Sequence, residues 1–291
     1  MNYKITHNTH YSYNNFVNLC YNEARLTPRS FTRQVCNHSK LIVEPDPSGY
    51  RERKDFFGNT VCFFSIQRPH QELSVIVTSE VEVYASNFQL DLVNGFEWED
   101  VHDQLHIDVN EEILEMRQYI LESPMIPELP ELRTYAKTSF TPDRSLLESV
   151  AELTERLYSE FEYDTNFTSV ATPLKEVMEH RRGVCQDFAH LGIGCVRSMG
   201  LAARYVSGYI ETVTDSDQEQ LVGSGASHAW FSVYFPEIGW IDFDPTNNVM
   251  PTDRHITVAW GRDYSDVTPL KGVVYGSGTH ELSVSVDCRS V

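Results

Sequence analysis

The chain has 291 residues, which is enough for two hydrophobic cores of ordinary domain size. Its 42 Asp and Glu outnumber its 23 Lys and Arg, and the net charge of -19 repels nucleic-acid backbones and anionic lipid surfaces. No apolar run approaches the roughly 18 to 20 residues that span a membrane. We therefore expect a globular protein that binds neither nucleic acid nor membranes.

The first ten residues alternate polar and apolar side chains and lack the charged head and apolar stretch of a secretion signal. They predict a first β-strand and a cytoplasmic protein. The cysteines are scattered and form no Cys-x-x-Cys pair, so they indicate neither a zinc site nor a disulfide framework; they are Cys20, Cys36, Cys62, Cys185, Cys195 and Cys288. We expect no metal and no organic cofactor.

Residues 1–95 predict a β-rich domain. Runs rich in β-branched and aromatic residues occur at 40–43 and 61–66, and a long alternation follows at 73–84. Turn residues separate these runs, as in the stretch 45–49. The pattern is typical of an antiparallel β-sandwich joined by hairpins.

Residues 96–132 differ from what precedes them because they are acidic and interrupted by Pro124, Pro127 and Pro130. Prolines interrupt backbone hydrogen bonding and charges prefer water, so this segment is predicted to be a connector with short helical pieces. The acidic run is interpreted as a solvated face, with a bias toward basic substrates as the alternative.

The second domain is predicted to span residues 133–291. Ser145 has capping-box spacing ahead of a helix of about four turns, Pro173 opens a shorter helix, and a third helix begins at Cys185 and stops at Gly200. Strand patterns follow at 203–210, 228–235, 240–243, 272–275 and 282–286. This domain is therefore α+β, with helices preceding an antiparallel sheet.

Cys185 is the candidate nucleophile. A thiol attacks as the thiolate, and a helix N-terminus beside an imidazolium favours that form. Gly183 permits the tight or left-handed turn that presents the cysteine at such a position. The unpaired N–H groups at the start of the helix could also donate to an acyl oxyanion.

His228 and Asp244 are its candidate partners. The runs 229–235 and 239–243 are predicted strands, and their antiparallel pairing brings the start of the first beside the end of the second. The carboxylate can then hold one imidazole nitrogen while the other faces sulfur. Asp242 lies on the same face of its strand, so spacing alone leaves both aspartates as candidates for this role.

Several sequence blocks together resemble the bacterial transglutaminase-like superfamily, whose members are described as cysteine proteases. The blocks of the second domain are residues 183–190, 203–209, 227–230 and 244–248. Blocks 25–29 and 55–59 are similar to the β-rich domain that precedes such cores. The resemblance covers nearly the whole chain.

This resemblance implies a papain-like core whose Cys-His-Asp triad maps onto Cys185, His228 and Asp244, with the family's Asp-x-Thr pattern favouring Asp244. It does not fix the reaction, because the superfamily includes transferases, proteases and other amide hydrolases. We expect a cysteine amide hydrolase, and specifically a peptidase that acts on a protein or peptide through a thioester. The alternatives are acyl transfer from glutamine to an amine and a catalytically silent binding module.

Four further features have competing interpretations. Tyr163 is a candidate second oxyanion donor by position, with packing as the alternative. His190 lies about 140° round the helix from Cys185 and is expected to pack through a hydrogen bond. Cys195, ten residues further along that helix, is expected to be inert, and block 261–266 is expected to be a structural loop.

Overall fold

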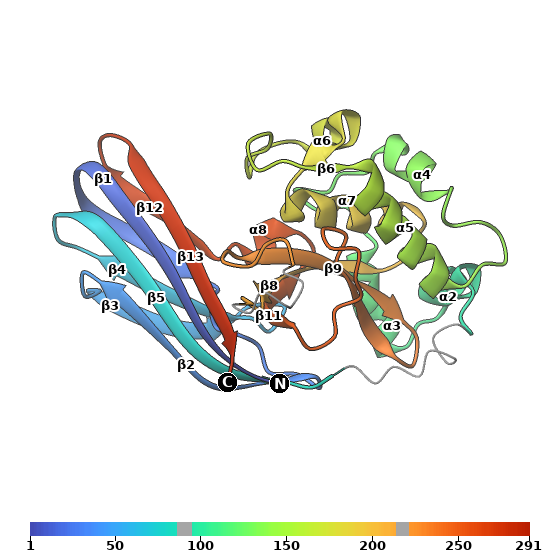
Figure 1. Ribbon diagram of the computed structural model, residues 1–291, viewed down its shortest axis with the longest axis horizontal. Helices are drawn as coiled ribbons and strands as arrows, with labels where there is room; N and C mark the ends of the chain where they lie inside the picture. The colour runs from blue at the N-terminus through green and yellow to red at the C-terminus, as the bar shows by residue number, and fades with distance from the viewer. Residues whose placement is uncertain (86–94, 214–220) are drawn as a thin grey trace.

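A computed structural model describes residues 1–85, 95–213 and 221–291. A long β-sheet forms one side of the molecule, and a core of helices and shorter strands forms the other, as Figure 1 shows. Both chain termini lie at the same end of the long sheet (Figure 1). Within the described ranges, no helix has the length and apolar character required to cross a membrane.

The first sheet has seven antiparallel strands. Its order is β2-β5-β1-β4-β3, and β12 and β13 also pair with β1. The strands are β1 (Asn2–Ala24), β2 (Gln34–Glu44), β3 (Gly49–Lys54), β4 (Thr60–Ile66), β5 (His70–Val83), β12 (Leu270–Gly276) and β13 (His280–Ser290). Strand β1 has four partners because its first half pairs with β5 and β13, whereas its second half pairs with β4 and β12. The predicted antiparallel, β-rich first half is confirmed.

The last two strands correct one expectation, which was that they extend the sheet of the second domain. They return instead to the first sheet, where Ser290 lies opposite Tyr3 and Leu270 lies opposite Ala24. Alternating polar and apolar residues predict that a run is a strand. They do not say with which neighbouring strand its backbone will form hydrogen bonds. The predicted boundary at residue 95 directly follows residues 86–94, which lie outside the described residues.

The second sheet has four antiparallel strands in the order β10-β9-β8-β11. They are β8 (Ala203–Ile210), β9 (His228–Phe235), β10 (Gly239–Phe243) and β11 (His255–Gly261). Helix α7 (Cys185–Ser198) packs on this sheet so closely that a Cβ added at Gly192 would lie 2.5 Å from the ring of Phe231. Every residue of β8 and β9 is buried, so both strands are covered on both faces.

Short helices and two short strands surround this sheet. They are α2 (Trp98–Ile107), α3 (Glu111–Met116), η1 (Arg117–Tyr119), α4 (Pro130–Ala136), α5 (Leu146–Glu160), α6 (Leu174–His180), α8 (Tyr264–Val267), β6 (Glu162–Tyr163) and β7 (Arg182–Gly183). The predicted cap of α5 is confirmed, because the Ser145 hydroxyl accepts a hydrogen bond from the Glu148 N–H. Residues 96–132 form short helices as predicted, but several of their apolar side chains, including Val101 and Leu105, are buried in the main core.

One end of the first sheet shares a hydrophobic core with the second half of the chain, and the rest of that sheet has a buried cluster of its own. Side chains from the end of the first sheet, such as Ile5 and Cys288, belong to the same buried cluster as α7 and the second sheet. Polar contacts add to this junction, since Gln34 Nε2 donates to the Thr257 carbonyl at 2.8 Å. The first sheet and the loop before β2 therefore lie directly against the second sheet.

Candidate active site

Cys185 is the first residue of α7 and is half-buried. The turn before it is fixed by Asp187, whose Oδ2 accepts hydrogen bonds from the Val184 N–H at 2.9 Å and from Thr168 Oγ1 at 2.7 Å. A Cβ at Gly183 would lie 2.8 Å from Asp187 Cβ, so this position needs glycine for close approach. The left-handed turn expected at Gly183 occurs elsewhere, at Arg181, which ends α6 with φ 52°.

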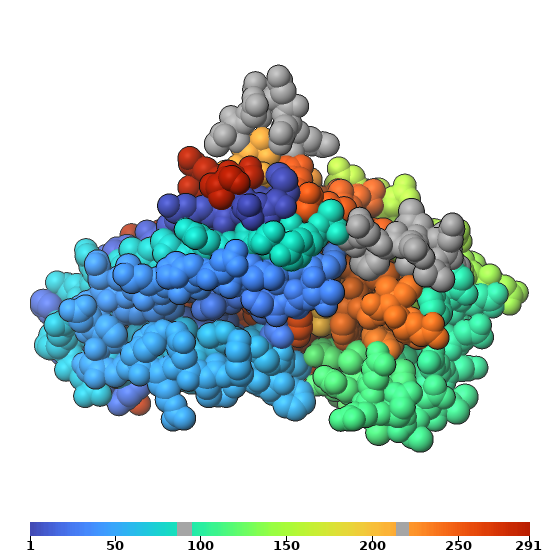
Figure 2. Space-filling view, turned by 90° about the horizontal axis from the view of Figure 1, so that it is seen from below, coloured from blue at the N-terminus to red at the C-terminus, as the bar shows by residue number. Residues whose placement is uncertain are grey.

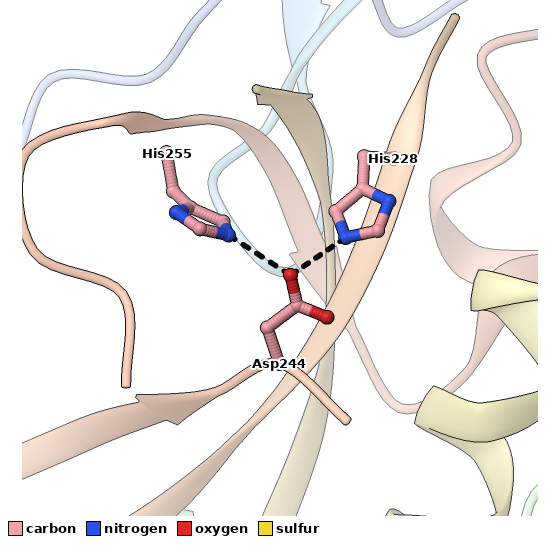
Figure 3. Close-up of side chains that lie close together, drawn as sticks. All are labelled: His228, Asp244 and His255. Atoms are coloured by element: carbon pink, nitrogen blue, oxygen red, sulfur yellow. Dashed lines mark hydrogen bonds and ion pairs between the residues drawn. The ribbon is translucent and has the colours of Figure 1, made fainter. Parts of the chain in front are cut away.

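His228 and Asp244 meet as the hairpin geometry predicts. Strand β10 pairs with β9 in the register that places Phe243 opposite Phe231, so His228 begins one strand beside the end of the other. His228 Nε2 lies 2.9 Å from Asp244 Oδ2, and both side chains are fully buried (Figure 3). Asp242 lies away from the imidazole, because its carboxylate binds Ser232 and Arg33 instead.

The Asp244 carboxylate accepts four hydrogen bonds. Its Oδ2 accepts from His228 Nε2, from His255 Nε2 at 3.0 Å and from Asn247 Nδ2 at 2.7 Å, while Oδ1 accepts from the Thr246 N–H at 2.9 Å. Burial alone would raise the pKa of Asp244, but the charge and hydrogen bond of His228, followed by His255, hold that pKa well below its usual value. Asp244 is therefore a fixed, ionised carboxylate.

His228 has one nitrogen bound and one nitrogen free. Because a carboxylate can only accept, the proton on the shared hydrogen bond belongs to His228 Nε2. Nδ1 is buried and has no hydrogen-bond partner among the described residues. Burial alone would lower the pKa of His228, but Asp244 and, to a smaller extent, the nearby Cys185 thiol raise it to about 10. The ring is therefore cationic at neutral pH, and its Nδ1–H is available to a hydrogen-bond acceptor.

His255 is the residue of this site that the sequence analysis did not identify. It begins β11 and reaches the same Asp244 oxygen as His228, as Figure 3 shows. No motif marks it in the sequence, and only the position of β11 at the edge of the sheet brings it there. One ligand atom from each of His228, Asp244 and His255 lies within 4.8 Å of the others, a spacing that could hold a metal ion. Such an ion would have to displace the hydrogen bonds that His228 and His255 make to Asp244.

Tyr163 lies beside the turn that carries Cys185. Strand β6 pairs in parallel with β7, so Tyr163 lies opposite Gly183. Its ring packs edge-on against Phe188, with ring centroids 6.3 Å apart, and 38% of the residue is exposed. Burial and, secondarily, Cys185 raise the pKa of Tyr163 to about 12. The phenol therefore keeps its proton at neutral pH and can donate a hydrogen bond.

The remaining residues singled out in the sequence have structural contacts. His190 Nε2 accepts a hydrogen bond from the Tyr264 N–H at 3.1 Å, which is the packing role expected of it. Cys195 is fully buried, and burial raises its pKa to about 12, which fits an unreactive thiol. In block 261–266, Asp263 accepts the Met125 N–H at 2.8 Å and joins this loop to the connector.

Two regions of the chain each match a known protein family. Residues 3–82 match the bacterial transglutaminase-like N-terminal region, and residues 133–245 match the transglutaminase-like superfamily. An uncharacterized protein of Mycobacterium tuberculosis is 35% identical, and the match covers 98% of this chain and 91% of that protein. An uncharacterized protein of Mycobacterium leprae is 34% identical over 98% of this chain and 97% of its own length.

A solved structure has the same fold over the full chain. It is the crystal structure of a protein from Cytophaga hutchinsonii that carries the provisional name cysteine protease. The TM-score is 0.77 at 22% sequence identity, and the match covers 100% of this chain and 91% of that one. The fold is thus an antiparallel N-terminal sheet followed by a transglutaminase-like core. By sequence and fold, this chain belongs to the bacterial transglutaminase-like superfamily.

Proposed function

We propose that the protein is a cysteine-nucleophile amide hydrolase that cleaves a protein or peptide through a thioester on Cys185. One observation carries this proposal: a buried His228–Asp244 pair leaves His228 Nδ1 without a hydrogen bond close to the Cys185 thiol. In a cysteine enzyme, the nucleophile needs such an oriented imidazole within reach. The Cys185 thiol lies near enough to His228 to raise the pKa of the imidazole, which suits this role.

The chemistry proceeds in two halves. With His228 cationic and Nδ1 protonated at neutral pH, Cys185 Sγ attacks the amide carbon as the thiolate, and His228 Nδ1–H then protonates the leaving amine as the C–N bond breaks. Water, deprotonated by the now neutral His228, attacks the thioester, which releases the carboxylic acid and restores the thiolate and the imidazolium. Asp244 holds the ring orientation and stabilises the imidazolium in both halves.

The oxyanion of each tetrahedral intermediate needs donors near Cys185. The N–H of Cys185 begins α7 and has no partner within the helix, so it can serve as one donor. Tyr163 is the proposed second donor. It lies opposite Gly183, in the turn that leads to Cys185, and its phenol is protonated at neutral pH. Removing one such donor typically costs about 100- to 1,000-fold in kcat, so Tyr163→Phe separates this role from packing against Phe188.

Acyl transfer is the second candidate, and the superfamily assignment supports it. The thioester is the same, but a lysine amine replaces water as the second nucleophile. The two reactions differ in their product rather than in the residues that form the acyl-enzyme.

A cytoplasmic location is part of this proposal. All six cysteines are free, and four of them are buried thiols. Unpaired cysteines in this number suit a reducing compartment.

The test is an assay of the full chain with a peptide library and with a glutamine-bearing protein plus a fluorescent amine. New amino termini indicate hydrolysis, and fluorescent protein indicates transfer. Cys185→Ala is expected to abolish either product. The matched control is Cys195→Ala, which removes a thiol from the same helix and should leave turnover nearly unchanged. Turnover that survives in Cys185→Ala contradicts the proposal.

A further inference from the structure

A cavity of about 870 Å³ lies at the junction of the two halves of the chain, away from the residues of the candidate triad. Its walls come from the loop before β2, from α3 and η1, and from β10 and the end of β11. Figure 2 views the molecule from the side on which the blue N-terminal residues, the green residues after 110 and the orange residues near 240 meet. None of the residues proposed for catalysis lines this cavity.

Arg204 provides a buried positive charge in the cavity wall. The residue is 7% exposed, and its Nε is buried without a hydrogen-bond partner in the described part of the chain. None of the ion pairs among the described residues involves Arg204. Its guanidinium instead stacks on two indole rings, with Cζ 4.3 Å from the Trp240 centroid and 3.8 Å from the Trp260 centroid.

Arg29 adds a second guanidinium on Trp260, with Cζ 3.6 Å from that ring centroid. It donates to the Phe57 carbonyl at 2.9 Å and to Asn59 Oδ1 at 2.6 Å, which are neutral acceptors, and its Nε is buried without a partner. No ion pair within the described ranges neutralises it. One buried cation, Arg204, and one half-buried cation, Arg29, therefore share one aromatic ring in the wall of one cavity.

The acidic groups near Arg204 do not cancel its charge. Arg33 also lines the cavity, and the Asp242 carboxylate is already paired with it at 2.7 Å. Glu111 and Glu115 line the cavity as well, but both are exposed to solvent. Burial lowers the pKa of Arg204 to about 9, which still leaves it charged at neutral pH. A positive pocket has thus formed in a chain whose net charge is -19.

We propose that this cavity, named here the arginine pocket, binds a small organic anion whose carboxylate or phosphate group pairs with Arg204, while Arg29 adds positive charge from the other face of Trp260. A buried charge without a counter-ion costs free energy, so a protein keeps one where a ligand supplies the opposite charge. Guanidinium groups suit both oxyanions because they donate in a planar fork. Other residues of the lining, including Phe31, Phe57 and Ile238, offer an apolar surface to the body of the ligand.

The experiment titrates the full chain with benzoate and, separately, with phenyl phosphate. Tryptophan fluorescence is the readout, since two of the four tryptophans lie at the pocket. Sodium chloride at matched ionic strength controls for screening. Saturable binding of benzoate identifies a carboxylate ligand, and saturable binding of phenyl phosphate identifies a phosphate ligand. If both give only the response of chloride, the proposal is overturned.

Variants place the binding in the pocket. Arg204→Gln is expected to lower the affinity for the anion by about tenfold or more, because a hydrogen bond between charged groups is lost. The matched control is Arg53→Gln, since Arg53 also stacks on an aromatic ring, at 4.8 Å from Phe63, but lies outside the pocket. Equal affinity in the wild type and Arg204→Gln contradicts the proposal.

A second variant tests the same pocket by a substitution at an exposed position, where folding is not at risk. Glu115→Gln removes an exposed carboxylate from the rim, so it is expected to tighten anion binding by about twofold, because a repulsive charge is lost. Unchanged or weaker binding in Glu115→Gln contradicts the proposal even if Arg204→Gln fails to fold. None of these readouts requires turnover, so the arginine pocket and the proposed enzyme activity stand or fall separately.

Discussion

The two ends of the second sheet hold buried charges that differ in how fully they are hydrogen-bonded. At one end, His228 lies opposite Gly208, and its partner Asp244 accepts four hydrogen bonds. At the other end, Arg204 lies opposite Ser232, about 13 Å along the strand by its rise per residue, and has a buried Nε without a partner. A saturated charge is fixed in place and can orient a neighbour, whereas an unsaturated one remains available to a ligand.

The first prediction tests the saturated end. Asp244→Asn is expected to reduce kcat by roughly 10⁴-fold, because the amide can bind the imidazole in the wrong tautomer and no longer stabilises its charge. Steady-state kinetics on the substrate found in the library assay measure this effect. Asp242→Asn is the matched control, since it lies two residues earlier and breaks the Arg33 ion pair without touching His228. If the two variants lose activity equally, Asp244 has no special role.

The second prediction concerns access to the free nitrogen of His228. Gly223 has φ +100°, and a Cβ there would lie 2.4 Å from His228 Nδ1. Gly223→Ala is therefore expected to displace the ring and to lower kcat/KM by about 100-fold, the scale of a 1 Å misplacement. The control is Gly225→Ala, because Gly225 also has positive φ (+88°) but no atom lies within 4 Å of its Cβ position. Similar losses in both variants would show that backbone strain, not contact with Nδ1, causes the effect.

The third prediction addresses His255 as a positioning residue. His255→Ala removes one donor from Asp244, and we expect a decrease of roughly 10- to 100-fold in kcat with little change in KM, since the lost bond is to a charged group. His255→Gln retains a side-chain N–H and should recover part of the loss. A rise in KM alone, or no rescue by glutamine, argues against positioning through Asp244.

The fourth prediction uses the charge of His228. Its pKa is raised to about 10 in the folded protein, so the folded state binds a proton more tightly than the unfolded state does. The resulting stabilisation is complete below about pH 6.5, the ordinary histidine value, and is lost as the pH rises toward 10. Denaturant unfolding of the wild type and His228→Gln measures it. The difference in free energy of unfolding should shrink between pH 6.5 and 10, and a constant difference contradicts the assignment.

Local patterns predicted the parts of the site that depend on neighbouring segments. The hairpin of β9 and β10 brings His228 beside Asp244, and the helix start at Cys185 follows from the turn before it. His255 was not predicted, because β11 reaches Asp244 by pairing with β8 at the far edge of the sheet. The arginine pocket was missed for the same reason, since Arg29 and Arg204 meet only after the two halves pack together.

The fold shows the same division. The cap at Ser145 and the strands of the first half follow from residue patterns close in sequence. The return of β12 and β13 to β1 was not foreseen, because their alternation suits either sheet equally. Arg181 rather than Gly183 takes the left-handed turn, and Gly183 is needed instead for its contact with Asp187.

The rate at which iodoacetamide labels each cysteine near neutral pH tests the central claim most directly. Cys36 is the internal reference, because it and Cys185 are the two half-buried cysteines and burial raises the pKa of Cys36. The account predicts that Cys185 is alkylated at least about tenfold faster than Cys36, and that His228→Ala removes this difference. Equal, slow labelling of both thiols in the wild type would contradict an activated Cys185.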